Sequence, residues 1–186
     1  MHRKLRNDEL GRLTTEEFKE TEKLKITIIL DNIRSQHNIG SAFRTADSFL
    51  IEKMILCGIS ATPPTAEIHK SALGAEFSVE WEYCKDTLQA VHELKQHGYT
   101  IVSIEQAENS ISLEKTGTAL LEDGSKFLSG DKKYALIFGN EVKGVQQEVV
   151  DASHCVIEIP QLGTKHSLNI SVSVGIILWE FCRRRI

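Results

Sequence analysis

The chain has 186 residues, 41% of them hydrophobic and 26% charged, which is the composition of one folded globular domain. It contains no apolar run near the roughly 18–20 residues that span a bilayer, and its basic N-terminus leads into a polar acidic stretch instead of a secretory signal, so we expect a cytoplasmic protein. The net charge of −4 does not indicate a nucleic-acid binder, so any RNA-binding prediction needs a more specific motif.

The first half of the chain alternates predicted helices and strands. Thr14 and Glu17 form a capping box that opens a polar helix, and the β-branched run 26–30 is typical of a buried strand. Asn38 is a suitable N-cap for the amphipathic helix that follows. Pro63 and Pro64 then interrupt the chain. In chain order we expect helix 14–23, strand 26–30, helix 39–50, strand 54–57 and a short strand near Trp81.

The second half continues the alternation. Asp86 caps a helix that stops at Gly98. The further expected elements are strand 99–104, a strand fragment with loops over 109–131, strand 134–138, helix 145–152, strand 155–159 and helix 168–183. Strands that alternate with helices predict an α/β fold, with a mostly parallel sheet and helices on both faces. We expect one domain over 26–186, preceded by an N-terminal helical extension over 1–25.

Cysteine and histidine spacing does not indicate a metal site. The four cysteines are far apart and form no CxxC pair: Cys57, Cys84, Cys155 and Cys182. In a reducing cytoplasm we expect them to be small buried hydrophobic residues. His92 and His97 flank a glutamate as in a zinc-protease helix, but a spacing of five residues separates them by about 140° around a helix. We therefore predict that no metal is bound.

Three polar segments each follow a predicted buried strand: 32–46, 138–144 and 159–173. Ligands of open α/β sheets bind beyond the carboxyl ends of the strands, so these segments are candidates for the functional site. Glycines in the second and third segments leave bare backbone groups for a ligand. The chain has no GxxxxGK[ST] and no GxGxxG motif, which counts against an NTPase, a nicotinamide enzyme and a Rossmann-type methyltransferase. Backbone donors and acceptors without a phosphate cradle suit a neutral heterocycle such as adenine.

In this order and spacing, the three segments resemble the three motifs of the SpoU/TrmH family of RNA ribose methyltransferases, within the SPOUT superfamily. The similarity runs from about Ile26 to Glu180, and the third motif reads IPxxGxxxSLNxSVS. The resemblance implies S-adenosylmethionine as cofactor and a ribose 2′-hydroxyl of RNA as methyl acceptor. It also implies a homodimer with composite active sites, and a C-terminal trefoil knot, which sequence physics alone would not predict.

The resemblance also assigns roles to particular residues. It implies a catalytic group of Arg44, Asn38, Glu141, Ser167 and Asn169. It implies cofactor contacts, largely through backbone groups, at Ile104, Gly139, Asn140, Gly144, Ile159, Leu162, Ser167 and Leu168. The sequence departs from the family pattern at Val142, which can narrow its loop, and at Ser173. Each assignment has an ordinary structural alternative: a helix cap, a surface arginine, a loop carboxylate or the start of the last helix.

The reaction limits what Arg44 can do. A 2′-hydroxyl must lose a proton while its oxygen attacks a sulfonium methyl in line, and arginine is too basic to accept that proton readily. We expect Arg44 to orient the ribose and stabilise developing negative charge, while the proton passes to a phosphate or to water.

The sequence is compatible with more than one RNA substrate. The basic clusters at 2–6 and 183–185 can be solvated termini or RNA contacts. About 25 residues precede the first strand, too few for a separate domain, so we expect a small prefolded RNA, a tRNA loop, to be read by shape. The alternatives are ribosomal RNA, a base nitrogen as methyl acceptor, and a non-catalytic RNA-binding SPOUT protein.

Overall fold

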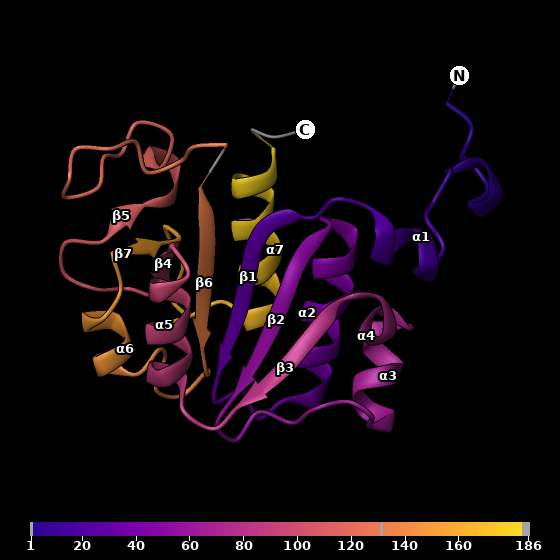
Figure 1. Ribbon diagram of the computed structural model, residues 1–186, viewed down its shortest axis with the longest axis horizontal. Coiled ribbons are helices and arrows are strands. Elements are labelled where there is room, and N and C mark those ends of the chain that lie inside the picture. The colour runs from indigo at the N-terminus through magenta and orange to yellow at the C-terminus, as the bar shows by residue number, and fades with distance from the viewer. Residues whose placement is uncertain (1, 131, 184–186) are drawn as a thin grey trace.

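The computed structural model describes residues 2–130 and 132–183. Asp131 and the arginines Arg184 and Arg185 of the predicted basic C-terminus lie outside the described residues. Within them, seven parallel strands form one sheet in the order β3-β2-β1-β6-β4-β7-β5 (Figure 1). The strands are β1 (Leu24–Asp31), β2 (Ile51–Cys57), β3 (Glu80–Cys84), β4 (Tyr99–Ile104), β5 (Ile111–Ser112), β6 (Lys133–Gly139) and β7 (Cys155–Glu158).

Helices cover both faces of the sheet, as predicted. They are α1 (Thr15–Glu20), α2 (Gln36–Ser48), α3 (Ala66–Ala72), α4 (Ala75–Ser78), α5 (Thr87–Gln96), α6 (Gln147–Asp151) and α7 (Ile170–Cys182), with 3₁₀ turns at Asn7–Glu9 and Leu113–Lys115. On β1, Ile28 and Leu30 join the core formed with α2, α3 and α7, whereas Ile29 joins the core formed with α5 and α6. Burial on both faces explains why the central strands are continuous apolar runs.

Two helices that the sequence did not predict, α3 and α4, lie between β2 and β3. The Thr65 side chain caps α3 by accepting from the amide of Ile68 at 3.2 Å, and Leu73 ends the helix with a left-handed φ of 54°. Helix α3 packs so closely on α2 that a Cβ at Gly40 would lie only 2.4 Å from the Ile68 carbonyl oxygen. Glycine at position 40 therefore sets the separation of these two helices.

The predicted N-cap of α2 was wrong. Ser35 is the N-cap, and its hydroxyl accepts from the Asn38 amide at 3.2 Å, so the helix begins at Gln36. Serine caps helices about as well as asparagine, and here the earlier residue takes the role. Asn38 lies in the first helical turn and is 8% exposed. Because it is not the N-cap, its side chain can form hydrogen bonds elsewhere.

The N-terminal segment packs against the sheet domain. The predicted capping box is confirmed: the amide of Glu17 donates to Thr14 Oγ1 at 3.2 Å, and the amide of Thr14 donates to Glu17 Oε2 at 2.8 Å. Phe18 of α1 is 4% exposed and joins the core that contains α2 and α4. The proposed division at residue 25 stays a prediction. None of the described helices combines the length and apolar character that crossing a membrane requires.

The cysteines are free thiols at different depths. Cys57 and Cys182 are buried as predicted, whereas Cys84 and Cys155 are only partly buried, so full burial was wrong for these two. Burial raises the pKa of Cys57 and of Cys155 to about 12. Both thiols are therefore protonated at neutral pH.

Candidate active site at the carboxyl ends of the central strands

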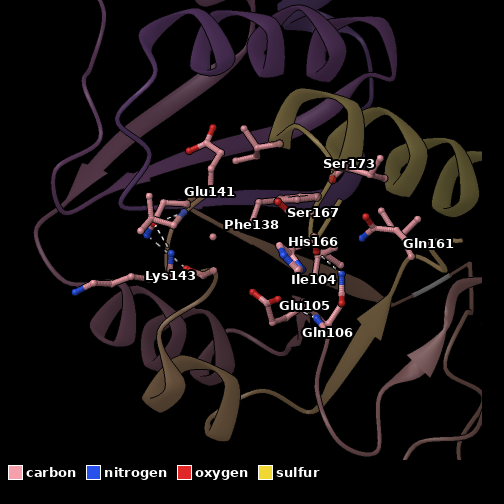
Figure 2. Close-up of a pocket in the computed structure, with 17 residues that line it drawn as sticks. Ile104, Glu105, Gln106, Phe138, Glu141, Lys143, Gln161, His166, Ser167 and Ser173 are labelled. Atoms are coloured by element: carbon pink, nitrogen blue, oxygen red, sulfur yellow. Dashed lines mark hydrogen bonds between the residues drawn. The ribbon is translucent and has the colours of Figure 1, made fainter. Parts of the chain in front are cut away.

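A cavity of about 300 Å³ lies beyond the carboxyl ends of β4, β6 and β7, where the fold predicts a ligand site (Figure 2). Ile104, Phe138 and Leu168 contribute apolar lining. The cavity brings together seven of the predicted cofactor contacts: Ile104, Gly139, Asn140, Gly144, Ile159, Ser167 and Leu168. Leu162, the eighth, does not line it and is fully exposed.

One wall of the cavity is a tight loop over residues 139–145, here called the glycine hairpin. Asn140 Oδ1 accepts from the amides of Val142 at 3.1 Å and Lys143 at 2.9 Å, and the Gly144 amide donates to the Asn140 carbonyl at 2.8 Å. Gly144 has a φ of +67°, and a Cβ at Gly139 would lie 2.0 Å from the carbonyl carbon of Gly144. Both glycines are therefore needed for this backbone path.

Glu105 fixes the glycine hairpin from the neighbouring strand. Its Oε2 accepts from the Val145 amide at 2.9 Å, and its Oε1 accepts from the Gln106 amide at 2.9 Å. Gln106 Nε2 in turn donates to the His166 carbonyl at 3.0 Å, which ties this strand end to the third motif. The sequence predicted a cofactor contact at Ile104 but did not single out the adjacent Glu105. The available signal was a carboxylate directly after a buried strand.

The three motifs meet through a chain of side-chain hydrogen bonds. Asn38 Nδ2 donates to Glu141 Oε1 at 2.7 Å, and Asn169 Nδ2 donates to Asn38 Oδ1 at 3.2 Å. Asn169 also caps α7, since its Oδ1 accepts from the Ser171 amide at 2.8 Å. Asn169 thus starts the last helix and also binds Asn38. We call Glu141, Asn38 and Asn169 the polar triad.

Ser167 and Ser173 lie on the other side of the cavity from the glycine hairpin (Figure 2). Ser167 is exposed, so its hydroxyl can reach a bound ligand. Ser173, one of the two departures from the family pattern, donates to the Asn169 carbonyl at 3.4 Å. The other departure, Val142, is 83% exposed, so its side chain does not pack into the hairpin and the backbone turn around Asn140 is kept.

A second residue that the sequence did not single out, Asp31, connects the first and second motifs. It is fully buried at the end of β1 and accepts from Thr87 Oγ1 at 2.6 Å. The amide and Nε2 of Gln146 donate to it at 3.0 and 2.8 Å, and Asn32 Nδ2 donates at 2.8 Å. Four donors compensate the burial of this carboxylate. Asp31 therefore holds the start of the first motif against the chain that follows the second motif.

Arg44 is not brought to the cavity within one chain. It is exposed on α2, six residues after Asn38, or about 9 Å further along the helix axis. It lines a separate cleft of about 860 Å³, together with residues 10–15, Phe18 and parts of α3 and α4. The structure thus separates the predicted catalytic arginine from the other four predicted catalytic residues. Among the described residues, no group of three or more His, Cys, Asp or Glu side chains could hold a metal ion.

Comparison with known proteins gives a consistent result. The model of the SpoU rRNA methylase family matches residues 25–179. An uncharacterized tRNA/rRNA methyltransferase of Borreliella burgdorferi is 32% identical over 91% of this chain and 68% of its own length. The chain spans 62% of the length of other curated relatives that it matches.

Two solved structures share the fold. A TrmH/SpoU tRNA modifying enzyme of A. aeolicus superposes with a TM-score of 0.75 at 26% identity, covering 92% of this chain and 82% of that one. An AdoMet-bound rRNA methyltransferase from Sinorhizobium meliloti superposes with a TM-score of 0.75 at 24% identity. The match covers 91% of this chain and 60% of the chain of that enzyme.

Proposed function

Because the chain belongs to the SpoU rRNA methylase family, we propose that it transfers a methyl group from S-adenosylmethionine to a ribose 2′-hydroxyl of RNA. The polar triad carries this proposal. It joins Asn38, Glu141 and Asn169, which come from three distant motifs, beside a cavity that presents backbone groups and apolar lining. A buried amide bonded on both sides has a fixed orientation, which a site that positions a reacting hydroxyl requires.

The lining of the cavity suits this cofactor in polarity and in charge. Ile104, Phe138 and Leu168 offer apolar surface for an adenine ring, and the glycine hairpin lines the cavity with backbone groups that can meet its edge. The carboxylates of Glu105 and Glu141 favour a cationic ligand. When bound, S-adenosylmethionine supplies an electrophilic methyl group on a sulfonium sulfur.

In the proposed reaction, the chain positions the ribose and stabilises charge. Ser167 lies where its hydroxyl can contact the acceptor nucleotide, and the polar triad holds the adjoining backbone. Arg44 orients the ribose and stabilises the developing oxyanion. Its distance from the cavity of its own chain supports a homodimer in which Arg44 of the partner subunit completes each site. We also propose that the C-terminal part of the chain forms the trefoil knot that the family resemblance implies.

We favour tRNA as the substrate over ribosomal RNA. The A. aeolicus tRNA modifying enzyme matches 92% of the chain. The large cleft beside Arg44, lined by residues 10–15, offers room for an RNA strand next to that arginine.

The test is methyl transfer from labelled S-adenosylmethionine to bulk tRNA and to deproteinised ribosomal RNA, followed by nuclease digestion and mass spectrometry. We expect a 2′-O-methyl nucleoside from tRNA. Label only in ribosomal RNA would change the substrate, and a methylated base would contradict the proposed chemistry. Failure to bind S-adenosylmethionine in calorimetry would favour the non-catalytic RNA-binding alternative.

The composite site has its own test. Arg44→Ala should abolish transfer while cofactor affinity stays within a few-fold. Glu141→Ala should also be inactive. Mixing the two inactive variants under conditions of subunit exchange should restore about a quarter of wild-type activity, because half of the dimers then contain one intact site. No recovery after proven exchange would show that Arg44 acts within its own chain.

A further inference from the structure

A second, smaller cleft lies on the glycine hairpin away from the cofactor cavity. It has a volume of about 240 Å³ and is lined by residues from the ends of β1, β2 and β6: Asn32, Arg34, Ile59, Asn140, Val142, Lys143 and Gln146. Asn140, Val142 and Lys143 line both cavities, so the two lie on either side of the same hairpin. Figure 2 shows the Lys143 side chain directed away from the cofactor cavity.

The charge of this cleft is positive in a chain whose net charge is −4. Arg34 and Lys143 are both exposed, and the lining contains no carboxylate side chain. Neither cation forms an ion pair with any residue in 2–130 or 132–183. Their charges are therefore available to an anionic ligand.

The amide side chains of the cleft are already engaged. Asn32 donates to Asp31, and its Oδ1 accepts from the Ile59 amide at 3.1 Å. Gln146 Nε2 also donates to Asp31, at 2.8 Å. The two cations are the polar side chains of the cleft that are left for recognition.

The backbone that carries Arg34 is rigid. The Ile33 amide donates to the buried hydroxyl of Ser60 at 2.8 Å, and that hydroxyl donates to the Leu30 carbonyl at 3.1 Å. Gly58 allows the close approach of Asn32, since a Cβ there would lie 2.2 Å from Asn32 Oδ1. The Arg34 side chain therefore starts from a fixed point beside the cleft, which reduces the entropy lost on binding.

We propose that Arg34 and Lys143 bind a backbone phosphate of the RNA strand adjacent to the methylated nucleotide. The inference rests on the proposed function, because it takes the neighbouring cavity as the methyl-transfer site. The cleft lies across the glycine hairpin from that cavity, so a strand bound at the site can extend over the hairpin and reach it. Val142 at 83% and Ile59 at 58% exposure add apolar surface against which a sugar or base can pack.

The test compares RNA binding by Arg34→Gln, Lys143→Gln and the double variant. Fluorescence anisotropy with labelled bulk tRNA and ribosomal RNA, without cofactor, would be measured over a series of salt concentrations. Each substitution should weaken binding several-fold and lower the slope of log affinity against log salt by about one, since each removes one phosphate contact. The Arg34→Gln variant should bind S-adenosylmethionine within two-fold of wild type.

A matched control is the double variant Lys70→Gln with Lys126→Gln, which removes the same charge from exposed positions outside the cleft. It should keep a near-wild-type salt slope. Wild-type affinity and slope in the cleft double variant, or an equal loss in the control, would overturn the inference. Thermal unfolding verifies that each variant is folded. If Lys143→Gln disturbs the glycine hairpin, the Arg34→Gln variant by itself still tests the proposal.

The two proposals fail differently. Normal methyl transfer by wild type, combined with unchanged RNA binding by the cleft variants, defeats only the phosphate site. RNA binding that depends on Arg34 and Lys143 without methyl transfer to either RNA supports the phosphate site and defeats the proposed activity.

Discussion

The side-chain amide of Asn38 donates a 2.7 Å hydrogen bond to Glu141, a residue 103 positions later in the chain. Asn38 is buried in the first turn of α2, whereas Glu141 lies on the exposed glycine hairpin. The bond therefore ties the glycine hairpin to the first turn of α2.

Asn38→Asp should lower kcat more than Asn38→Ala. Alanine removes the donor to Glu141, whereas aspartate also places a second carboxylate beside it, and like charges repel at this distance. We expect at least a ten-fold loss for alanine, because small displacements of a positioned group reduce turnover strongly. Steady-state methylation assays measure both, with His37→Ala, an exposed neighbour, as control. Equal activity of Asn38→Asp and wild type would contradict the role of this bond.

Glu105→Ala should weaken cofactor binding roughly ten-fold. The substitution leaves the Val145 amide without its 2.9 Å acceptor, and an unsatisfied donor costs about 1–3 kcal/mol. Glu105→Gln keeps an acceptor oxygen and should be milder. Calorimetry with S-adenosylmethionine measures the dissociation constants, and Glu108→Ala is the matched exposed control. A larger effect of Glu108→Ala than of Glu105→Ala would count against this prediction.

Gly139→Ala should destroy the hairpin. Its Cβ would meet the Gly144 carbonyl carbon at 2.0 Å and the Val145 amide nitrogen at 2.1 Å, and backbone atoms cannot move aside as a flexible side chain can. We expect a loss of about 1–3 kcal/mol of stability from overpacking, and at least a ten-fold loss of cofactor affinity. Gly130→Ala, where a Cβ would meet nothing within 4 Å, should be neutral in urea unfolding. Near-wild-type stability and affinity of Gly139→Ala would be incompatible with the hairpin geometry.

His154 should make the folded state less stable in acid. His154 lies at the surface, but partial burial of its ring, and then the positive charge of Lys95, lower its pKa below 6.5, and its Nδ1 accepts from the Ile101 amide at 2.8 Å. The stabilisation from neutral His154 is complete above the ordinary pKa and is lost as pH falls through the lower folded-state value. Urea unfolding at pH 7.5 and 5.5 should show a smaller pH effect in His154→Ala than in wild type. His92→Ala, on exposed α5 surface, serves as control, and an unchanged pH effect in His154→Ala would refute the assignment.

Much of the fold could be predicted because the sheet is buried on both faces. Continuous β-branched runs such as 26–30 indicate central parallel strands, and β4 has the predicted bounds of 99–104. Local signals failed where two residues compete for one role, as at the α2 cap, or where helices are short, as in α3 and α4. A left-handed Leu73 between those helices has no sequence signature.

The candidate site was predicted through its motifs, but the contacts that support it were not. Glu105 binds a backbone amide 40 residues away, and Asp31 binds Gln146 at a separation of 115 residues. Periodicity cannot reveal such partners, because they depend on strand order. The same applies to Arg44, whose place on α2 was predicted but whose distance from the cavity follows from the packing of the whole chain.

The bond between Asn169 and Asn38 closes a loop of 131 residues. Closing so long a loop has an entropic cost that is met before the contact stabilises the chain, so we expect this bond to form late in folding. During refolding, the recovery of cofactor binding should therefore report when the native structure is complete. We expect it to lag behind the recovery of the helical circular-dichroism signal.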